Sequence, residues 1–235
     1  MTLIKICGLT SVEDALEVAR LDVQIIGLVF ARSRRQVSCR QAAEISVQLK
    51  KLPHRPALAG VFVNENPRIV DETVRQCGLD LVQLSGDENW DYCRRVSHPL
   101  IKAIHISLSA RSKDIVDYIS RGNNFERPPL YLLDSKEDGK YGGTGTSFEW
   151  DIAREISASF PAIIAGGLDP QNVRSLIEHV RPLGVDVSSG VETHGRKDIA
   201  KIRAFIESVR SADGPVPSGG SRLNKYIYKG EYDVT

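Results

Sequence analysis

Two residues that can exchange protons close short apolar runs of this sequence. Cys7 ends the run Leu3–Cys7, and Asp134 ends the run Leu130–Asp134. A thiol, with an ordinary pKa of about 8.5, is a usable base where its surroundings lower that pKa. A carboxylic acid kept protonated can donate a proton. We therefore predict that Cys7 is a general base and Asp134 a general acid; the alternatives are a cysteine that only packs and an aspartate that only caps a loop.

Glycine-rich turns follow the last three apolar runs of the chain. Glycine lets the backbone approach a ligand closely, and successive N–H groups form a concavity that binds anions. Three such turns in sequence favour a phosphate site over simple chain reversals. The residues that we predict to bind phosphate are Gly143, Gly145, Gly166, Gly167, Ser189 and Gly190.

Charged residues lie at two further positions near the ends of apolar runs. Arg34 and Arg35 follow the second run, and a guanidinium fork matches a carboxylate, although a solvated surface pair is the alternative. Lys5 is a charged residue inside the first run, where it would either pair with an acid or point at a substrate. The sequence alone does not separate these two roles for Lys5.

Eight apolar runs alternate with helical patterns and would have to position these residues. Nearly continuous apolar character is typical of a parallel strand that is buried on both faces. Eight strand–helix units predict a single (β/α)₈ barrel, the TIM barrel, over residues 1–210, with an open sheet as the alternative. The active site of such a barrel lies at the carboxyl ends of its strands. The predicted strands are Leu3–Cys7, Ile25–Phe30, Ala57–Val63, Leu79–Leu84, Leu100–Ile106, Leu130–Asp134, Ala162–Ala165 and Val185–Ser188.

Capping residues predict where three of the helices begin. Ser11 and Asp14 resemble a capping box. The pairs Asn66-Pro67 and Asp169-Pro170 each place a capping side chain before a proline, whose missing N–H costs nothing in the first helical turn. We therefore expect helices to start at these positions.

Composition limits the classes of function. The 235 residues carry a net charge of +1 and no long apolar run, so we predict a cytoplasmic protein that binds neither nucleic acid nor membrane. Four scattered cysteines and five histidines lack a zinc spacing, so no metal is expected. Residues 211–235 begin with a Pro-, Gly- and Ser-rich stretch, which predicts a flexible linker and a C-terminal tail. The tail is either disordered or a docking segment.

Seven ordered sequence blocks resemble the phosphoribosylanthranilate isomerase family, and they cover residues 3–209. One glycine-rich block would carry little weight, whereas seven blocks at predicted strand ends, in the family's order, carry much more. The blocks are KICGLT, SRRQVS, GVFVN, VQLSGDE, LLD with GGTG and FEW, IIAGGLDPQNV, and GVDVSSGVE with GRKD.

The resemblance implies an isomerase of tryptophan biosynthesis that performs an Amadori rearrangement without a cofactor. The family's general acid matches Asp134, which would protonate the furanose ring oxygen, and its general base matches Cys7, which would remove the C2′ proton. The family's arginine matches Arg35, which would hold the anthranilate carboxylate. The phosphate would lie on the glycine turns that are named above.

Some positions depart from the family, and other functions stay open. Ser85 stands where the family usually has histidine, and Arg34 where it usually has proline. The alternatives are a histidine-pathway or bifunctional phosphoribosyl isomerase and a barrel that binds sugar phosphates without catalysis. A further hypothesis is that Arg222–Thr235 docks another enzyme of the pathway.

Overall fold

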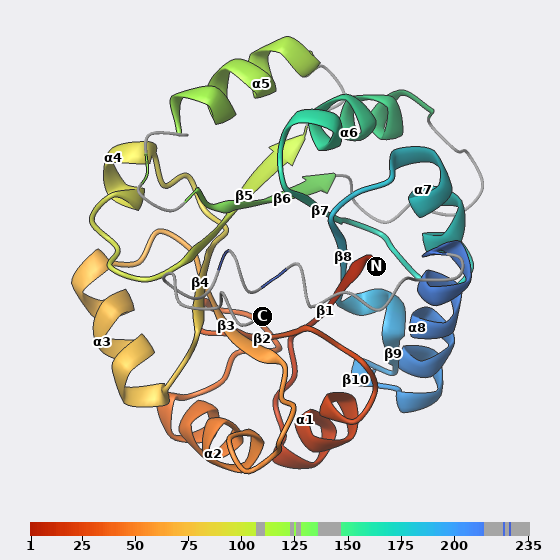
Figure 1. Ribbon diagram of the computed structural model, residues 1–235. Helices are drawn as coiled ribbons and strands as arrows, with labels where there is room; N and C mark the ends of the chain where they lie inside the picture. The colour runs from red at the N-terminus through yellow and green to blue at the C-terminus, as the bar shows by residue number, and fades with distance from the viewer. Residues whose placement is uncertain are drawn as a thin grey trace, which may run out of the picture.

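The computed structural model describes residues 1–106, 111–122, 125, 128–135, 147–213, 223 and 226. Eight parallel strands close into a barrel in their order along the chain, with β8 pairing back to β1 (Figure 1). The prediction of a single (β/α)₈ barrel is therefore confirmed. The strands are β1 (Leu3–Cys7), β2 (Ile25–Val29), β3 (Ala57–Phe62), β4 (Leu81–Leu84), β5 (Leu100–Ile106), β6 (Leu130–Ser135), β7 (Ala162–Ala165) and β8 (Gly184–Val187).

The predicted strand ends match the structure closely, with small differences that have local causes. Strand β4 begins at Leu81 and not at the predicted Leu79. The Asp80 carboxylate accepts hydrogen bonds from Arg55 at 2.6 Å and from the Leu58 N–H at 2.8 Å. Asp80 therefore belongs to the connection before the strand, where its side chain joins two loops at the base of the barrel.

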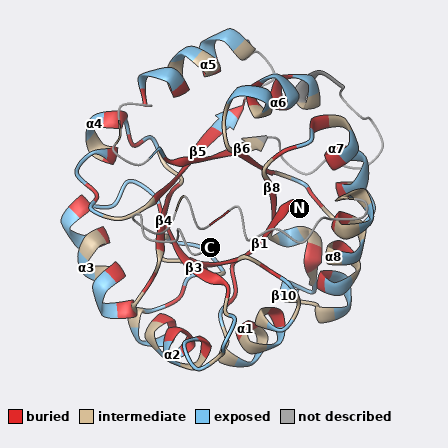
Figure 2. Ribbon diagram, viewed as in Figure 1, coloured by how far each residue is buried: buried red, intermediate tan, exposed pale blue. Residues whose placement is uncertain are grey.

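Helices form a ring outside the strands, and their inward faces are buried (Figure 2). A short hairpin of β9 (Glu192–Thr193) and β10 (Arg196–Lys197) follows the 3₁₀ turn η1 (Ser189–Val191). The helices are α1 (Val12–Ala19), α2 (Cys39–Leu49), α3 (Pro67–Cys77), α4 (Trp90–Cys93), α5 (Ser112–Arg121), α6 (Ser147–Ser159), α7 (Val173–Val180) and α8 (Ile199–Asp213).

Two of the three predicted helix starts are confirmed. Ser11 accepts a hydrogen bond from the Asp14 N–H at the start of α1, and Asn66 caps α3 with Pro67 in its first turn. The third prediction is wrong, because α7 begins at Val173 and not at Pro170. The Asp169 carboxylate instead accepts the N–H groups of the two residues that precede the helix and so caps a turn.

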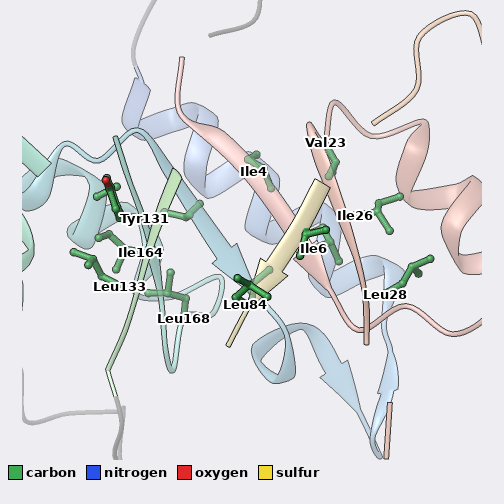
Figure 3. Packing of buried hydrophobic residues seen from close by; sticks show 14 of the residues in the cluster. Ile4, Ile6, Val23, Ile26, Leu28, Leu84, Tyr131, Leu133, Ile164 and Leu168 are labelled. Carbon is green, nitrogen blue, oxygen red and sulfur yellow. The ribbon is translucent and has the colours of Figure 1, made fainter. Parts of the chain in front are cut away.

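Alternate residues of each strand pack in two separate cores. Outward side chains such as Ile4 and Ile6 of β1 and Ile26 and Leu28 of β2 pack against the helices (Figure 3). Inward side chains, from the first residues of the strands up to Ala165 at the end of β7, form the second core, which we call the base core. This base core consists of Leu3, Ile25, Ala57, Ala59, Leu81, Ile101, Ala103, Leu130, Leu132, Ile163, Ala165 and Leu223.

The base core includes one residue from the predicted tail. Leu223 is only 4% exposed, and Tyr226 packs partly buried against the same core. Nearby, the Thr2 N–H donates to the Asp213 carboxylate at 2.9 Å, which ties the start of β1 to the end of α8. The base of the barrel therefore brings together both ends of the barrel and part of the segment after it.

Replacing Leu223 should test this packing. We expect Leu223→Ala to lower the free energy of unfolding by about 2 kcal/mol, because it removes buried methyl groups from a core. Urea unfolding monitored by circular dichroism would measure the change. Val47→Ala is the control, because Val47 is 56% exposed and its truncation should change stability by less than about 0.5 kcal/mol. An unchanged stability for Leu223→Ala would contradict the packing.

Candidate active site

Cys7 and Asp134 lie at the same mouth of the barrel. Cys7 is the last residue of β1, and Asp134 is the last but one of β6. Because the strands are parallel, both side chains belong to the carboxyl end of the barrel. Strands β7 and β8 separate them around the ring, so the two groups face the mouth from different sides. A substrate between them would meet one proton donor and one proton acceptor.

A buried lysine lies beneath Cys7. Lys5 precedes it by two residues and so points to the same side of β1. The Lys5 ammonium lies 3.0 Å from the Asp186 carboxylate, and its side chain is 1% exposed. Gly27 on β2 leaves room for both groups, since a Cβ there would lie 2.8 Å from the Cys7 sulfur and 3.2 Å from Lys5 Nζ. Lys5 therefore pairs with an acid and also contacts the thiol.

The positive charges around Cys7 oppose the effect of its burial, whereas the Asp186 carboxylate adds to it. Burial raises the pKa of the Cys7 thiol above its ordinary value, while the Lys5 ammonium, by its charge and its hydrogen bond, pulls that pKa down. Burial would lower the pKa of Lys5, but Asp186 and Cys7 outweigh it and raise that pKa. Lys5 thus stays charged and favours a thiolate, as does the more distant Lys197.

The predicted carboxylate ligand, Arg35, contacts an acid of its own chain. Its Nε lies 2.6 Å from Oε1 of Glu192, and its Nη2 lies 3.1 Å from Oε2. Arg34 and Lys197 bind the same carboxylate at 2.6 and 3.1 Å. The stem of Arg35 passes over Gly8, which has a φ of +82° and directly follows Cys7. The guanidinium is therefore held beside Cys7.

Glu192 and Lys197 are site residues to which the sequence analysis gave no role. Burial would raise the pKa of Glu192, but hydrogen bonds from Arg35 and Lys197 hold it below its ordinary value. Burial lowers the pKa of Lys197 despite its partner Glu192. The Lys197 ammonium also donates to the Ser188 carbonyl at 2.8 Å, which links the hairpin to the end of β8.

Two of the three glycine turns lie within the described part of the chain. Gly166 and Gly167 have φ values of +93° and +61°, which favour glycine. At Gly190 an added Cβ would collide with the Leu168 carbonyl, so the turns after β7 and β8 are in direct contact. Ser189 begins η1 in the second of these turns. Gly143 and Gly145 lie outside the described residues.

His105 is a further polar residue at this mouth that the sequence analysis did not identify. Its Nε2 lies 3.0 Å from the Ser85 carbonyl oxygen, and its Nδ1 lies 3.8 Å from Oδ2 of Asp134. His105 alternates with Ile101 and Ala103, which point into the barrel. This period of two was the sequence signal that could have placed His105 at the mouth.

The described part of the chain contains neither a cluster of metal ligands nor a membrane-spanning helix. No cluster of three or more histidine, cysteine, aspartate or glutamate side chains there could hold a metal ion. No helix among the described residues is long and apolar enough to cross a membrane.

Comparison with known proteins decides the family. The model of the family described as N-(5′-phosphoribosyl)anthranilate (PRA) isomerase matches residues 4–208. The chain belongs to this family. It is 44% identical over 211 residues to the N-(5′-phosphoribosyl)anthranilate isomerase of Dehalococcoides mccartyi, a match that covers 89% of this chain and 96% of that protein. The resemblance inferred from the seven blocks is thereby confirmed.

A solved structure supports the same assignment. The phosphoribosyl anthranilate isomerase of Thermotoga maritima superposes with a TM-score of 0.76 at 36% identity, covering 90% of this chain and all of that one. A second structure of a family member contains reduced 1-(o-carboxyphenylamino)-1-deoxyribulose 5-phosphate and has a TM-score of 0.74 at 34% identity. The predicted enzyme class, an isomerase of tryptophan biosynthesis, is that of the family.

Removing the charge of Glu192 should lower stability in a pH-dependent way. The folded pKa of Glu192 is lowered, so its contribution is fully present above the unfolded value of about 4.3. That contribution is lost as the pH falls through the lower, folded value. We expect Glu192→Gln to cost about 2 kcal/mol at pH 7, because hydrogen bonds to charged groups are lost.

Urea unfolding between pH 3 and 7 would measure this effect, and the difference from the unchanged protein should shrink at the acidic end. Glu44→Gln is the matched control, because Glu44 pairs with Arg40 on an exposed surface of α2 and should contribute less than about 0.5 kcal/mol. Equal losses for the two variants would contradict the role of Glu192.

Proposed function

We propose that Cys7 and Asp134 perform the reaction of this family, the Amadori rearrangement of N-(5′-phosphoribosyl)anthranilate to the carboxyphenylamino-deoxyribulose phosphate. The observation that supports this most directly is their place at one mouth, at the ends of β1 and β6. Asp134 is the general acid and Cys7 the general base. The chain is then an intramolecular isomerase of tryptophan biosynthesis.

The two residues act at the ring oxygen and at C2′, the two sugar atoms on either side of C1′. Asp134 donates its proton to the furanose ring oxygen, and the bond between that oxygen and C1′ breaks to leave a protonated Schiff base. The Cys7 thiolate then removes the proton from C2′, and the electron pair of that C–H bond forms the enolamine. Transfer of the C2′ hydroxyl proton to solvent and of a solvent proton to C1′ gives the ketone.

The reactive form of the enzyme carries a thiolate on Cys7 and a proton on Asp134. Its total charge equals that of the form with a thiol and a carboxylate, so pH does not change the ratio of these two forms. Burial disfavours the reactive form because it raises the pKa of the thiol, whereas the Lys5 ammonium favours it. In this proposal the Lys5 ammonium increases the share of reactive enzyme that burial decreases.

Groups at the two ends of the mouth would hold the substrate. Arg35 would bind the anthranilate carboxylate, since its guanidinium is fixed by Glu192 next to Gly8 and Cys7. A planar guanidinium suits a carboxylate because the two can form parallel hydrogen bonds. The phosphate would lie on the backbone N–H groups of Gly143, Gly145, Gly166, Gly167, Ser189 and Gly190.

Removing the acid or the base should abolish most activity while leaving the fold intact. We expect Cys7→Ala and Asp134→Asn each to lower kcat by about 10² to 10⁴, the usual contribution of one acid–base group. The loss of the substrate's fluorescence would follow turnover, and circular dichroism would check folding. Cys39→Ala and Asp114→Asn are controls outside the mouth. Near-normal turnover by either site variant would contradict its assigned role.

The same assay would separate the alternative functions. Turnover of phosphoribosylanthranilate alone supports the proposal. Turnover of the histidine-pathway substrate as well would mean a bifunctional isomerase, and binding of both substrates without turnover would favour a barrel that only binds sugar phosphates.

A docking role for the tail is a separate proposal. A multifunctional tryptophan biosynthesis protein of Phycomyces blakesleeanus is 38% identical over 253 residues, and the match covers 88% of this chain but 32% of that protein. Pathway enzymes are thus joined in that relative. The cytoplasmic location inferred from the sequence is likewise a proposal.

A pull-down with and without residues 214–235 would test docking. The bait would be the enzyme that makes the substrate or the one that consumes the product. Loss of capture on truncation, with capture retained by Leu223→Ala, would support docking. Equal capture by the full and the truncated chains would contradict it.

A further inference from the structure

His105 and Asp134 are neighbours at the ends of adjacent strands. The register of β5 and β6 places their Cα atoms opposite each other. Their side chains point into the barrel, because the residues two positions earlier, Ala103 and Leu132, belong to the base core. On its other side Asp134 is paired with Ala165 of β7, which does not titrate. Of these two partners in the register, only His105 can exchange a proton with Asp134.

The hydrogen bond to Ser85 determines which ring nitrogen of His105 carries hydrogen. The Ser85 carbonyl can only accept, and it lies 3.0 Å from Nε2, so Nε2 must be the donor. In the neutral ring the other nitrogen, Nδ1, then has a free electron pair. This nitrogen is the one that lies nearer to Asp134, at 3.8 Å from Oδ2.

The distance between Nδ1 and Oδ2 is too long for a hydrogen bond but short enough for a small movement to form one. It is about 1 Å longer than a hydrogen bond. Contacts of catalytic groups are often long before substrate binds and shorten afterwards. Both side chains are about one third exposed at the mouth, so a small rotation of either can close the distance without unpacking the core.

We propose that His105 is a positioning residue for the general acid, which shares a proton with Asp134 and so keeps the carboxyl supplied for transfer to the substrate. A neutral His105 accepts a hydrogen bond from the protonated carboxyl, whereas a protonated His105 donates to the carboxylate. In both cases one proton lies between the two groups. After Asp134 has given its proton to the ring oxygen, His105 takes a proton from water and passes it back to the carboxylate. This inference rests on Asp134 being the acid.

On β7 the inward residue beside this pair is Ala165, which carries no charge. On β4 the last inward residue, Gln83, lies opposite Ile101, four residues before His105. The charged groups of the described interior, Lys5 and Asp186, lie on β1 and β8 and are paired with each other. His105 is therefore the proton-exchanging side chain that the neighbouring strands place beside Asp134.

Two substitutions test the roles of the two ring nitrogens of His105 one at a time. His105→Gln places an amide near the Nε2 position, so it retains the bond to Ser85 and leaves no atom near Asp134. His105→Asn places an amide near the Nδ1 position, where its oxygen can accept the carboxyl proton. We expect kcat to fall at least tenfold in His105→Gln and by less in His105→Asn, with KM within about twofold of the unchanged protein in both.

His98→Gln is the matched control. Its Nδ1 also lies beside a carboxylate, at 3.0 Å from Asp71, but Asp71 belongs to α3 in the outer ring of helices. The kcat of His98→Gln should equal that of the unchanged protein. Thermal unfolding of each variant would show that the fold is kept.

A double-mutant cycle decides whether His105 acts through Asp134. In the Asp134→Asn background, His105→Gln should have no further effect, because the proton that it positions is gone. Normal kcat in His105→Gln, beside an inactive Asp134→Asn, would overturn this inference and leave the proposed function standing. An equal fall in both backgrounds would also overturn it. Normal turnover by Asp134→Asn would overturn the proposed function and this inference together.

Discussion

Closure of eight parallel strands into a ring is the constraint on which the rest of this structure depends. In a closed ring every second residue of a strand points inward, so one position along the strand decides the environment of a side chain. On β1 this gives Leu3 in the apolar base, Lys5 in the middle and Cys7 at the mouth. Along β1 the barrel interior therefore contains an apolar side chain, then a charged one and then a thiol.

The buried charge in the middle of the barrel connects packing to chemistry. Desolvation of Lys5 is costly, and the Asp186 carboxylate at 3.0 Å offsets part of that cost. Such a pair is weak evidence for added stability. Its position between the apolar base and the thiol of Cys7 instead gives it an electrostatic role, since a fixed positive charge beside a buried sulfur changes its ionisation more than a mobile one in water.

Much of the fold could be predicted from the sequence, because apolar runs report burial directly. The same runs located Cys7 and Asp134 at strand ends, where the structure places them. The start of α7 was missed because Asp169 resembles a helix cap but caps a turn. The partners of Lys5 and Arg35, Asp186 and Glu192, lie 181 and 157 residues further along the chain. Only strand order and register bring such residues together, so no local sequence pattern could identify these partners.

The hydrogen bond between Thr2 and Asp213 has a consequence for how this barrel can be tethered. It places both ends of the barrel at the base, whereas Cys7, Asp134 and Arg35 open at the opposite end. A second protein attached at either end would therefore lie below the base and leave the mouth that holds Cys7, Asp134 and Arg35 unobstructed.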